Sequence, residues 1–244
     1  MTVPSIKISK SRADRAGERL RLWFASNVAL DEDRLTQTVW DIDRWRQTHA
    51  YPLSLVTPGV RNWVSQETAG EVIVGQRLKR FDRILDKLER LHSMRLTQME
   101  DIGGCRAVLR TPAEVEAVAR RIRRKWDVQG ESDYRELGKP ITGYRSLHVI
   151  VERRERLVEV QLRTTGQQYW AEVVERTSSR TGIKLKDGDG PRRLIEYFRV
   201  ASDITWQQEN GIRVDQDLRA ELANLRPQVA RYFQRDRRPG RRRR

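Results

Sequence analysis

The chain has 244 residues, of which 37% are hydrophobic and 34% charged, so its apolar content suffices for a core but leaves little to spare. The formal net charge of +15 favours polyanionic partners such as nucleotides, RNA or ribosomes. The single cysteine, Cys105, excludes an internal disulfide framework and a cysteine-based zinc site. No apolar run reaches membrane-spanning length and residues 1–20 are too polar for a secretory signal, so we expect a cytoplasmic protein without a membrane partner.

The chain up to about residue 66 is expected to be helical after a flexible start. Residues 1–17 are polar and predict a flexible N-terminus. Helices are predicted at about 16–29, 33–47 and 56–66, with Pro52 and Pro58 separating the last two.

Residues 75–92 predict one amphipathic helix with a basic face. The apolar arc is formed by Leu78, Phe81, Ile84, Leu85 and Leu88. The opposite arc holds Lys79, Arg80, Arg83 and Lys87, and Arg77 borders the apolar side. Most such faces are merely solvated. Four cations in under three turns repel one another, however, and a bound polyphosphate would relieve that repulsion.

A turn and a buried strand are predicted next, in the sequence from Asp101 to Arg110. Asp101 and Arg106 would lie on opposite faces of a straight strand, but Gly103 and Gly104 permit a bulge or bend. A helix over about 112–126, a strand over 127–134 and a loop over 135–142 follow. Lys139 lies on that loop, in a position to meet a phosphate.

The stretch 144–163 predicts a β-hairpin, because apolar and polar residues alternate along it. With the turn centred between Arg153 and Arg154, the pairs expected on the polar face are His148 with Glu159, Ser146 with Gln161, and Tyr144 with Arg163. The valines and leucines of the other face are expected to enter the core. A polar face in water is common in antiparallel sheets. An aromatic ring, an imidazole, a carboxylate, an amide and a guanidinium together indicate a functional surface instead.

Helices are predicted over about 165–177, 192–208 and 215–233, and residues 235–244 predict a disordered, arginine-rich tail. Strands in the middle with helices at both ends make an α+β fold. We expect a single domain over residues 18–234.

The chemistry of these residues points to metal-assisted transfer between nucleotides. No phosphate-binding glycine loop, histidine-rich metal motif or GxSxG element is present. Asp101 and Glu159 form a candidate Mg²⁺ pair, since this ion binds one or two carboxylates and completes its shell with water and phosphate oxygens. The nearby cations suit phosphates, and Tyr144 suits stacking on a base.

Four motifs, in order, resemble the synthetase domain of the RelA/SpoT family, the alarmone synthetases of the stringent response. They begin at Arg77, Asp101, Gly143 and Glu159, in a similarity that runs from about residue 45 to 175. The resemblance implies a mixed sheet of about five strands in a nucleotidyltransferase-like fold. It implies a GTP diphosphokinase-like enzyme that transfers pyrophosphate from ATP to the 3′-hydroxyl of GDP or GTP with Mg²⁺.

The resemblance also assigns roles by residue. Asp101 and Glu159 would hold the metal and, with Gln161 and His148, form the catalytic group. ATP would be bound by Arg77, Lys79, Lys87 and Arg106. The acceptor would be bound by Tyr144, Lys139 and Arg163.

The chain departs from the family pattern at two places that leave alternatives open. Arg83 stands where a serine is usual, and Gly138 replaces a proline before Lys139. A toxin-type enzyme acting on the 3′ end of tRNA or on adenosine nucleotides stays open, with an antitoxin as its partner. A non-catalytic RNA- or ribosome-binding module is the remaining alternative, and assembly of identical copies is undetermined.

Overall fold

The computed structural model describes residues 7–26 and 31–236, and the chain divides into two compact units. The first unit comprises Met1–Ala107, Ala117–Glu131 and His148–Gln161. The second unit comprises Val108–Glu116, Ser132–Leu147 and Leu162–Arg244. The expectation of one domain over 18–234 stays a prediction.

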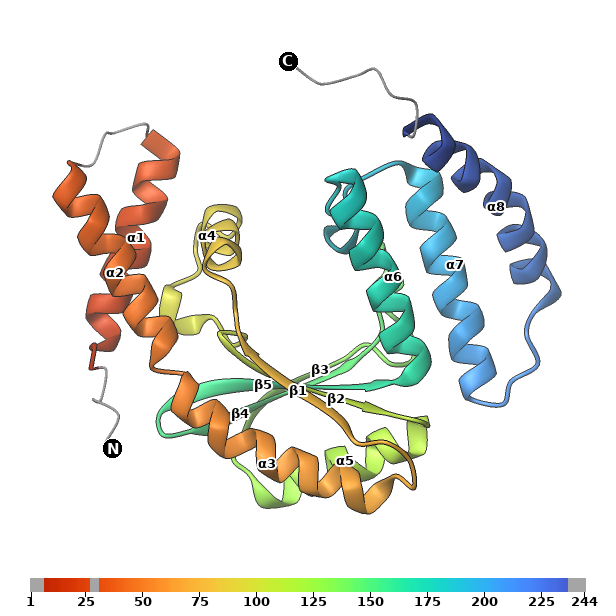
Figure 1. Ribbon diagram of the computed structural model, residues 1–244, viewed down its shortest axis with the longest axis horizontal. Coiled ribbons are helices and arrows are strands. Elements are labelled where there is room, and N and C mark those ends of the chain that lie inside the picture. The colour runs from red at the N-terminus through yellow and green to blue at the C-terminus, as the bar shows by residue number, and fades with distance from the viewer. Residues whose placement is uncertain (1–6, 27–30, 237–244) are drawn as a thin grey trace. The chain divides into compact units, whose positions relative to one another are not determined.

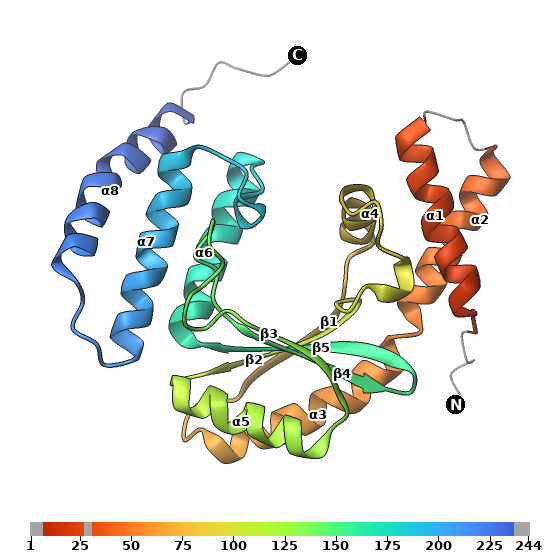
Figure 2. The same ribbon diagram turned by 180° about the vertical axis from the view of Figure 1, so that it is seen from behind.

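Most of a five-stranded mixed sheet belongs to the first unit. Its strands are β1 (Ile73–Leu78), β2 (Gly103–Leu109), β3 (Val128–Asp133), β4 (Leu147–Arg153) and β5 (Arg156–Thr164), in the order β1-β2-β5-β4-β3. Helices α3 (Ala50–Glu67) and α5 (Pro112–Lys125) lie along the same face of the sheet in both views (Figures 1 and 2). The predicted α+β class and the mixed sheet of about five strands are confirmed.

The β4–β5 hairpin has the faces that the sequence predicts. Val158 and Val160 are completely buried, whereas Glu159 and Gln161 between them keep some exposure. The turn is Arg154–Glu155, both with positive φ, so its centre lies one residue later than predicted. In a two-residue turn of this kind each cross-strand pair moves by two residues. An even shift keeps every side chain on its predicted face of the hairpin. The polar residues therefore still share one face, although the predicted cross-strand pairs are wrong.

Three helices of the first unit share one cluster of buried side chains. They are α1 (Lys10–Ser26), α2 (Glu32–Gln47) and α4 (Phe81–Arg90). The expected flexible start over residues 1–17 is wrong from residue 10 onward, and residues 1–6 lie outside the described residues. Ala13 and Ala16 are completely buried in this cluster. These small side chains allow α1 to approach its neighbours closely. The prediction of a flexible start relied on the polar composition of residues 1–17 and could not detect this packing.

The predicted helix over 75–92 is a strand followed by a shorter helix. Arg77 lies on β1 and Lys79 directly after it, while Lys87 lies on α4. The Lys79 amide donates to the Ile102 carbonyl at 2.8 Å, which fixes the end of β1 beside the start of β2. Sheet pairing therefore overrode a helical pattern whose apolar positions come mostly from residues 81–88.

Helix α3 begins earlier than predicted because neither proline interrupts it. Pro52 lies in its first turn, where the missing amide donor costs no helical hydrogen bond. Pro58 lies exposed inside the helix, and its neighbours Val56 and Val60 are completely buried. The side chain of Trp63 packs on Trp126, with ring centroids 4.6 Å apart.

The second unit contains α6 (Thr165–Thr181), α7 (Arg192–Glu209) and α8 (Gln216–Asp236), with α7 packed against both neighbours (Figures 1 and 2). Its core includes Tyr144, Trp170 and Phe198. Arg235 and Asp236 belong to α8, and the rest of the predicted tail lies outside the described residues. No helix in the described part of the chain has the length and apolar character that a membrane span requires.

Candidate active site

Asp101 lies in the turn that leads into β2, where two lysines bind its carboxylate. Lys79 donates to Oδ2 at 2.5 Å and Lys87 donates to Oδ1 at 2.9 Å. Burial acts to raise the pKa of this carboxyl, but the two ammonium groups outweigh burial and hold it below its usual value. Asp101 precedes β2, so the alternation of side chains along that strand does not place it on the face opposite Arg106.

Glu159 lies on β5 with both of its oxygens engaged. The Nδ1 atom of His148 lies 2.7 Å from Oε1, and Nε2 of Gln161 donates to Oε2 at 2.6 Å. Burial acts to raise the Glu159 pKa, and the charge of Asp101 adds to that effect. The bonds from His148 and Gln161 prevail and lower the pKa below its usual value.

The first unit thus brings together the predicted catalytic residues and three of the four predicted ATP-binding residues, Lys79, Lys87 and Arg106. The effect of Asp101 on the Glu159 pKa indicates that the two carboxylates lie close enough to interact. Arg106 extends the group, since its Nε donates to Oε1 of Gln161 at 3.4 Å. Arg77 is exposed on β1 and has not been drawn into the cluster.

The donor set of this cluster fits a magnesium ion rather than a transition metal. No group of three or more histidine, cysteine or acidic side chains suited to a metal occurs among the described residues. Mg²⁺ needs only one or two carboxylates, because substrate phosphates and water complete its octahedral shell. Asp101 and Glu159 supply that number, and neither carries a proton at neutral pH.

Tyr144, in the second unit, is buried rather than displayed on the surface, with 7% of its area exposed. The guanidinium of Arg163 lies 5.0 Å from its ring centroid and donates to its hydroxyl at 2.5 Å. The ammonium of Lys139 lies 5.3 Å from the same centroid. Both predicted acceptor-binding cations, Lys139 and Arg163, therefore contact the ring of Tyr144.

The loop that carries Lys139 is closed by backbone hydrogen bonds. The Lys139 amide donates to the Tyr144 carbonyl at 2.9 Å, and the Gly143 amide donates to the Lys139 carbonyl at 2.8 Å. Gly143 has a φ of 73°, and a Cβ at this position would lie 2.9 Å from Cα of Arg199 on α7. Only glycine allows this turn to approach the helix so closely.

Arg145 is a residue of this region that the sequence reasoning missed. It is 4% exposed, and its guanidinium donates to Ser202 Oγ at 3.1 Å and to Asp203 Oδ1 at 2.7 Å, both on α7. It also donates to the backbone carbonyls of Arg135 and Glu136, at the start of the loop. No local pattern could identify this role, since Asp203 follows Arg145 by 58 residues.

Arg83, where the chain departs from the family pattern, pairs with acids of its own helix. Its guanidinium lies 3.1 Å from Asp86 and 3.8 Å from Asp82, and about half of the side chain is exposed.

Cys105 is buried, which raises the pKa of its thiol to about 11, in agreement with a packing role.

Comparisons with known proteins identify a family region and a fold. Residues 76–179 match the model of a family described as a region found in RelA/SpoT proteins. Uncharacterized proteins of Mycobacterium bovis and Mycobacterium tuberculosis are 30% identical over 165 residues, or 67% of this chain. The matched part spans only 57% of the length of these relatives.

Solved structures with the same fold include small alarmone synthetases. Small alarmone synthetase 1 of Bacillus subtilis, bound to its product pppGpp, is 22% identical with a TM-score of 0.54. That alignment covers 77% of this chain and 99% of the other. Small alarmone synthetase 2 of the same organism is 22% identical with a TM-score of 0.58, over 70% and 95% of the two chains. A Streptococcus mutans protein is 25% identical with a TM-score of 0.53, over 74% and 98%. Residues 76–179 of this chain are therefore a RelA/SpoT-family region, in a chain with the fold of the small alarmone synthetases.

Proposed function

We propose that this protein is a (p)ppGpp synthetase, an ATP-dependent pyrophosphokinase. In the proposed reaction the 3′-hydroxyl oxygen of GDP or GTP attacks the β-phosphorus of ATP. The bond from that phosphorus to the AMP oxygen breaks, and AMP leaves with the bonding electrons. The single observation that carries the proposal is the pair of ionised carboxylates, Asp101 and Glu159, held among lysines and a histidine.

The carboxylates, the lysines and the histidine of the candidate active site have distinct roles in this proposal. Asp101 and Glu159 would hold Mg²⁺, which when bound neutralises charge on the phosphates. Lys79 and Lys87 now neutralise Asp101, and the triphosphate of ATP offers them an alternative anion. The Glu159–His148 pair would orient the reacting hydroxyl and accept its proton.

In the second unit, Tyr144, Lys139 and Arg163 would bind the acceptor. Because both cations contact the Tyr144 ring, binding of a base would replace a cation–ring contact by base stacking. The displaced cation would then be available to the acceptor phosphates. Catalysis would rest on positioning and on charge neutralisation.

A tRNA acceptor is the second candidate, and the observation that favours it is the net charge of +15. A long polyanion gains affinity from many such charges, whereas a single nucleotide contacts only a few. The same cluster of the first unit would perform the transfer in either case.

The test is to incubate the protein with γ-labelled ATP, Mg²⁺ and, separately, GDP, GTP, ATP or tRNA. Label should enter GDP or GTP in the wild type, and Asp101→Asn or Glu159→Gln should lower turnover by at least about a hundredfold. Asp33→Asn, an exposed carboxylate on α2, is the matched control. Label in tRNA alone would select the second candidate, and label in no acceptor would refute pyrophosphate transfer. Near-normal turnover of either site variant would refute the metal pair.

A further inference from the structure

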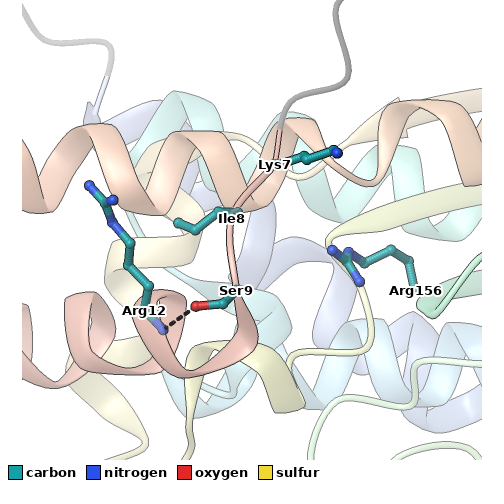
Figure 3. A pocket seen from close by; sticks show the side chains of 5 residues that line it. All are labelled: Lys7, Ile8, Ser9, Arg12 and Arg156. Atoms are coloured by element: carbon teal, nitrogen blue, oxygen red, sulfur yellow. Dashed lines mark hydrogen bonds between the residues drawn. The ribbon is translucent and has the colours of Figure 1, made fainter.

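A second cationic region of the first unit lies at the start of α1, where a cavity of about 460 Å³ opens. It is lined by Lys7, Ile8, Ser9, Arg12 and Arg156 (Figure 3). Every charged lining residue is positive, and no acidic side chain lines the cavity in the described part of the chain. The Ser9 hydroxyl accepts from the Arg12 amide at 3.3 Å, which fixes the rim (Figure 3).

Arg12 is held in place by an acid that lies outside the cavity lining. Its Nε donates to both carboxylate oxygens of Asp41 at 3.0 Å, and its Nη2 lies 2.9 Å from Oδ1. A second arginine, Arg19, lies 3.5 Å from the same carboxylate. The carboxylate of Asp41 is thus shared between two guanidinium groups, of which only that of Arg12 lines the cavity.

Arg156 is immobilised by neutral groups only. Its guanidinium lies 4.3 Å from the centroid of the Trp45 ring, and its Nε donates to Oγ1 of Thr48 at 2.9 Å. Its Nη1 donates to the Glu155 carbonyl at 2.8 Å. No carboxylate lies within ion-pair distance of Arg156 in the part of the chain described. Partial burial lowers the pKa of Arg156, and the charge of Glu155 offsets that effect only in part.

We propose that this cavity binds a phosphate group of a ligand, at a site separate from the candidate active site. Arg156 presents a planar donor fixed by its ring contact, which suits a phosphate oxygen. Lys7 adds a second positive charge to the lining, and Ile8 contributes an apolar side chain to it. Lys7, Ser9 and Arg12 precede the matched RelA/SpoT region, whereas Arg156 lies within it on β5.

The phosphate could belong to a free nucleotide or to an RNA backbone, and one experiment separates these sources. Inorganic tripolyphosphate and a short single-stranded RNA are each titrated into the full chain by isothermal calorimetry. The variants are Lys7→Gln and Arg156→Gln, and the control with the same change of charge is Arg124→Gln, on the exposed side of α5. Any binding at the candidate active site is common to all of them, so the difference reports on the cavity.

We expect Arg156→Gln to weaken binding at this site about tenfold or more, because it removes a charge-assisted contact. Lys7→Gln should weaken binding in the same direction, and this exposed residue can be changed without disturbing the core. Loss with tripolyphosphate identifies a free phosphate ligand, and loss with RNA alone identifies the nucleic-acid backbone. Affinities of both cavity variants equal to that of Arg124→Gln, for both titrants, would overturn the proposal.

Discussion

Asp101 and Glu159 each use both carboxylate oxygens for bonds to neighbouring side chains, and these bonds keep two partly buried acids ionised. In the proposed reaction, the two ammonium groups at Asp101 and the Gln161 amide at Glu159 would be replaced by Mg²⁺, and the Glu159–His148 contact would remain. The released lysines would keep their charges inside the site. Charge balance is thereby maintained before and after the substrate binds, which limits the cost of burial.

Tyr144 should contribute to stability as well as to the acceptor site, because its ring is buried among other rings. Tyr144→Ala should lower the free energy of unfolding by about 3–5 kcal/mol. It should also lower acceptor use by roughly five- to a hundredfold if the base stacks on this ring. Tyr144→Phe should change acceptor use little, since the ring face remains. Denaturant unfolding and acceptor KM measure the two effects.

Tyr169→Ala serves as the control for this prediction, since Tyr169 is 65% exposed on α6. A folded Tyr144→Ala enzyme with an unchanged acceptor KM would remove Tyr144 from the acceptor site. The stability effect would stand, because it depends on packing alone.

His49 should make the protein less stable in mild acid. Its imidazole is 2% exposed, and burial lowers its pKa to about 4. The unfolded chain, with a histidine pKa near 6.5, binds more protons between these two values. The free energy of unfolding should therefore fall by up to roughly 3 kcal/mol as the pH drops from about 6.5 to 4.

The measurement is urea unfolding of the wild type, His49→Gln and the exposed His92→Gln over this pH range. The slope should be reduced in His49→Gln and retained in His92→Gln. Parallel pH profiles of all three proteins would contradict the assignment to His49, since the other titrating groups are the same in each.

Among the elements, α7 determines the conformation of the loop that carries Lys139. Ser202 donates to the Gly143 carbonyl at 2.5 Å, and Arg145 joins the loop start to Asp203. Glu209, at the end of α7, accepts from the Thr164 hydroxyl at 2.8 Å and from the Gly166 amide at 3.0 Å. One helix thus supports both the loop before Tyr144 and the segment after Arg163.

We expect Arg145→Gln to raise the acceptor KM about tenfold or more while leaving the KM for ATP nearly unchanged. The reason is that Arg145 contacts the loop and α7, all in the second unit, whereas the predicted ATP-binding residues lie in the first. Asp203→Asn should shift the acceptor KM in the same direction, and Arg193→Gln, 64% exposed on α7, is the control. Equal increases for both substrates would indicate general unfolding instead of loop positioning.

For the whole molecule, the net charge predicts affinity for polyanions. Residues 237–244 contribute six arginines to the net charge of +15. Their deletion should leave pyrophosphate transfer between free nucleotides unchanged and should flatten the salt dependence of RNA binding. Binding assays at several salt concentrations, beside the turnover assay, measure both effects. A collapse of free-nucleotide turnover would place these arginines in the active site.

Features set by neighbouring residues could be predicted from the sequence, whereas features set by contacts between distant residues could not. The hairpin faces followed from alternation at Val158, Glu159 and Val160, because side chains on a strand have a strict period of two. Its turn was misplaced by one residue, since Arg154 and Glu155 carry positive φ without the glycine or asparagine that usually marks such a turn. The strand at Arg77 was missed because its partner, β2, lies about 25 residues further along the chain.

The α+β class and the candidate pair of acids, Asp101 and Glu159, could be predicted from the sequence alone, because periodicity and residue chemistry are local properties. Only the tertiary structure decided that Lys79 and Lys87 reach Asp101 from different elements, and that Arg163 and Lys139 cover the Tyr144 ring. The contacts of Arg145 and the cavity at Arg156 were likewise visible only in the tertiary structure. Each depends on contacts between distant residues, and burial and packing select those contacts among many that the sequence permits.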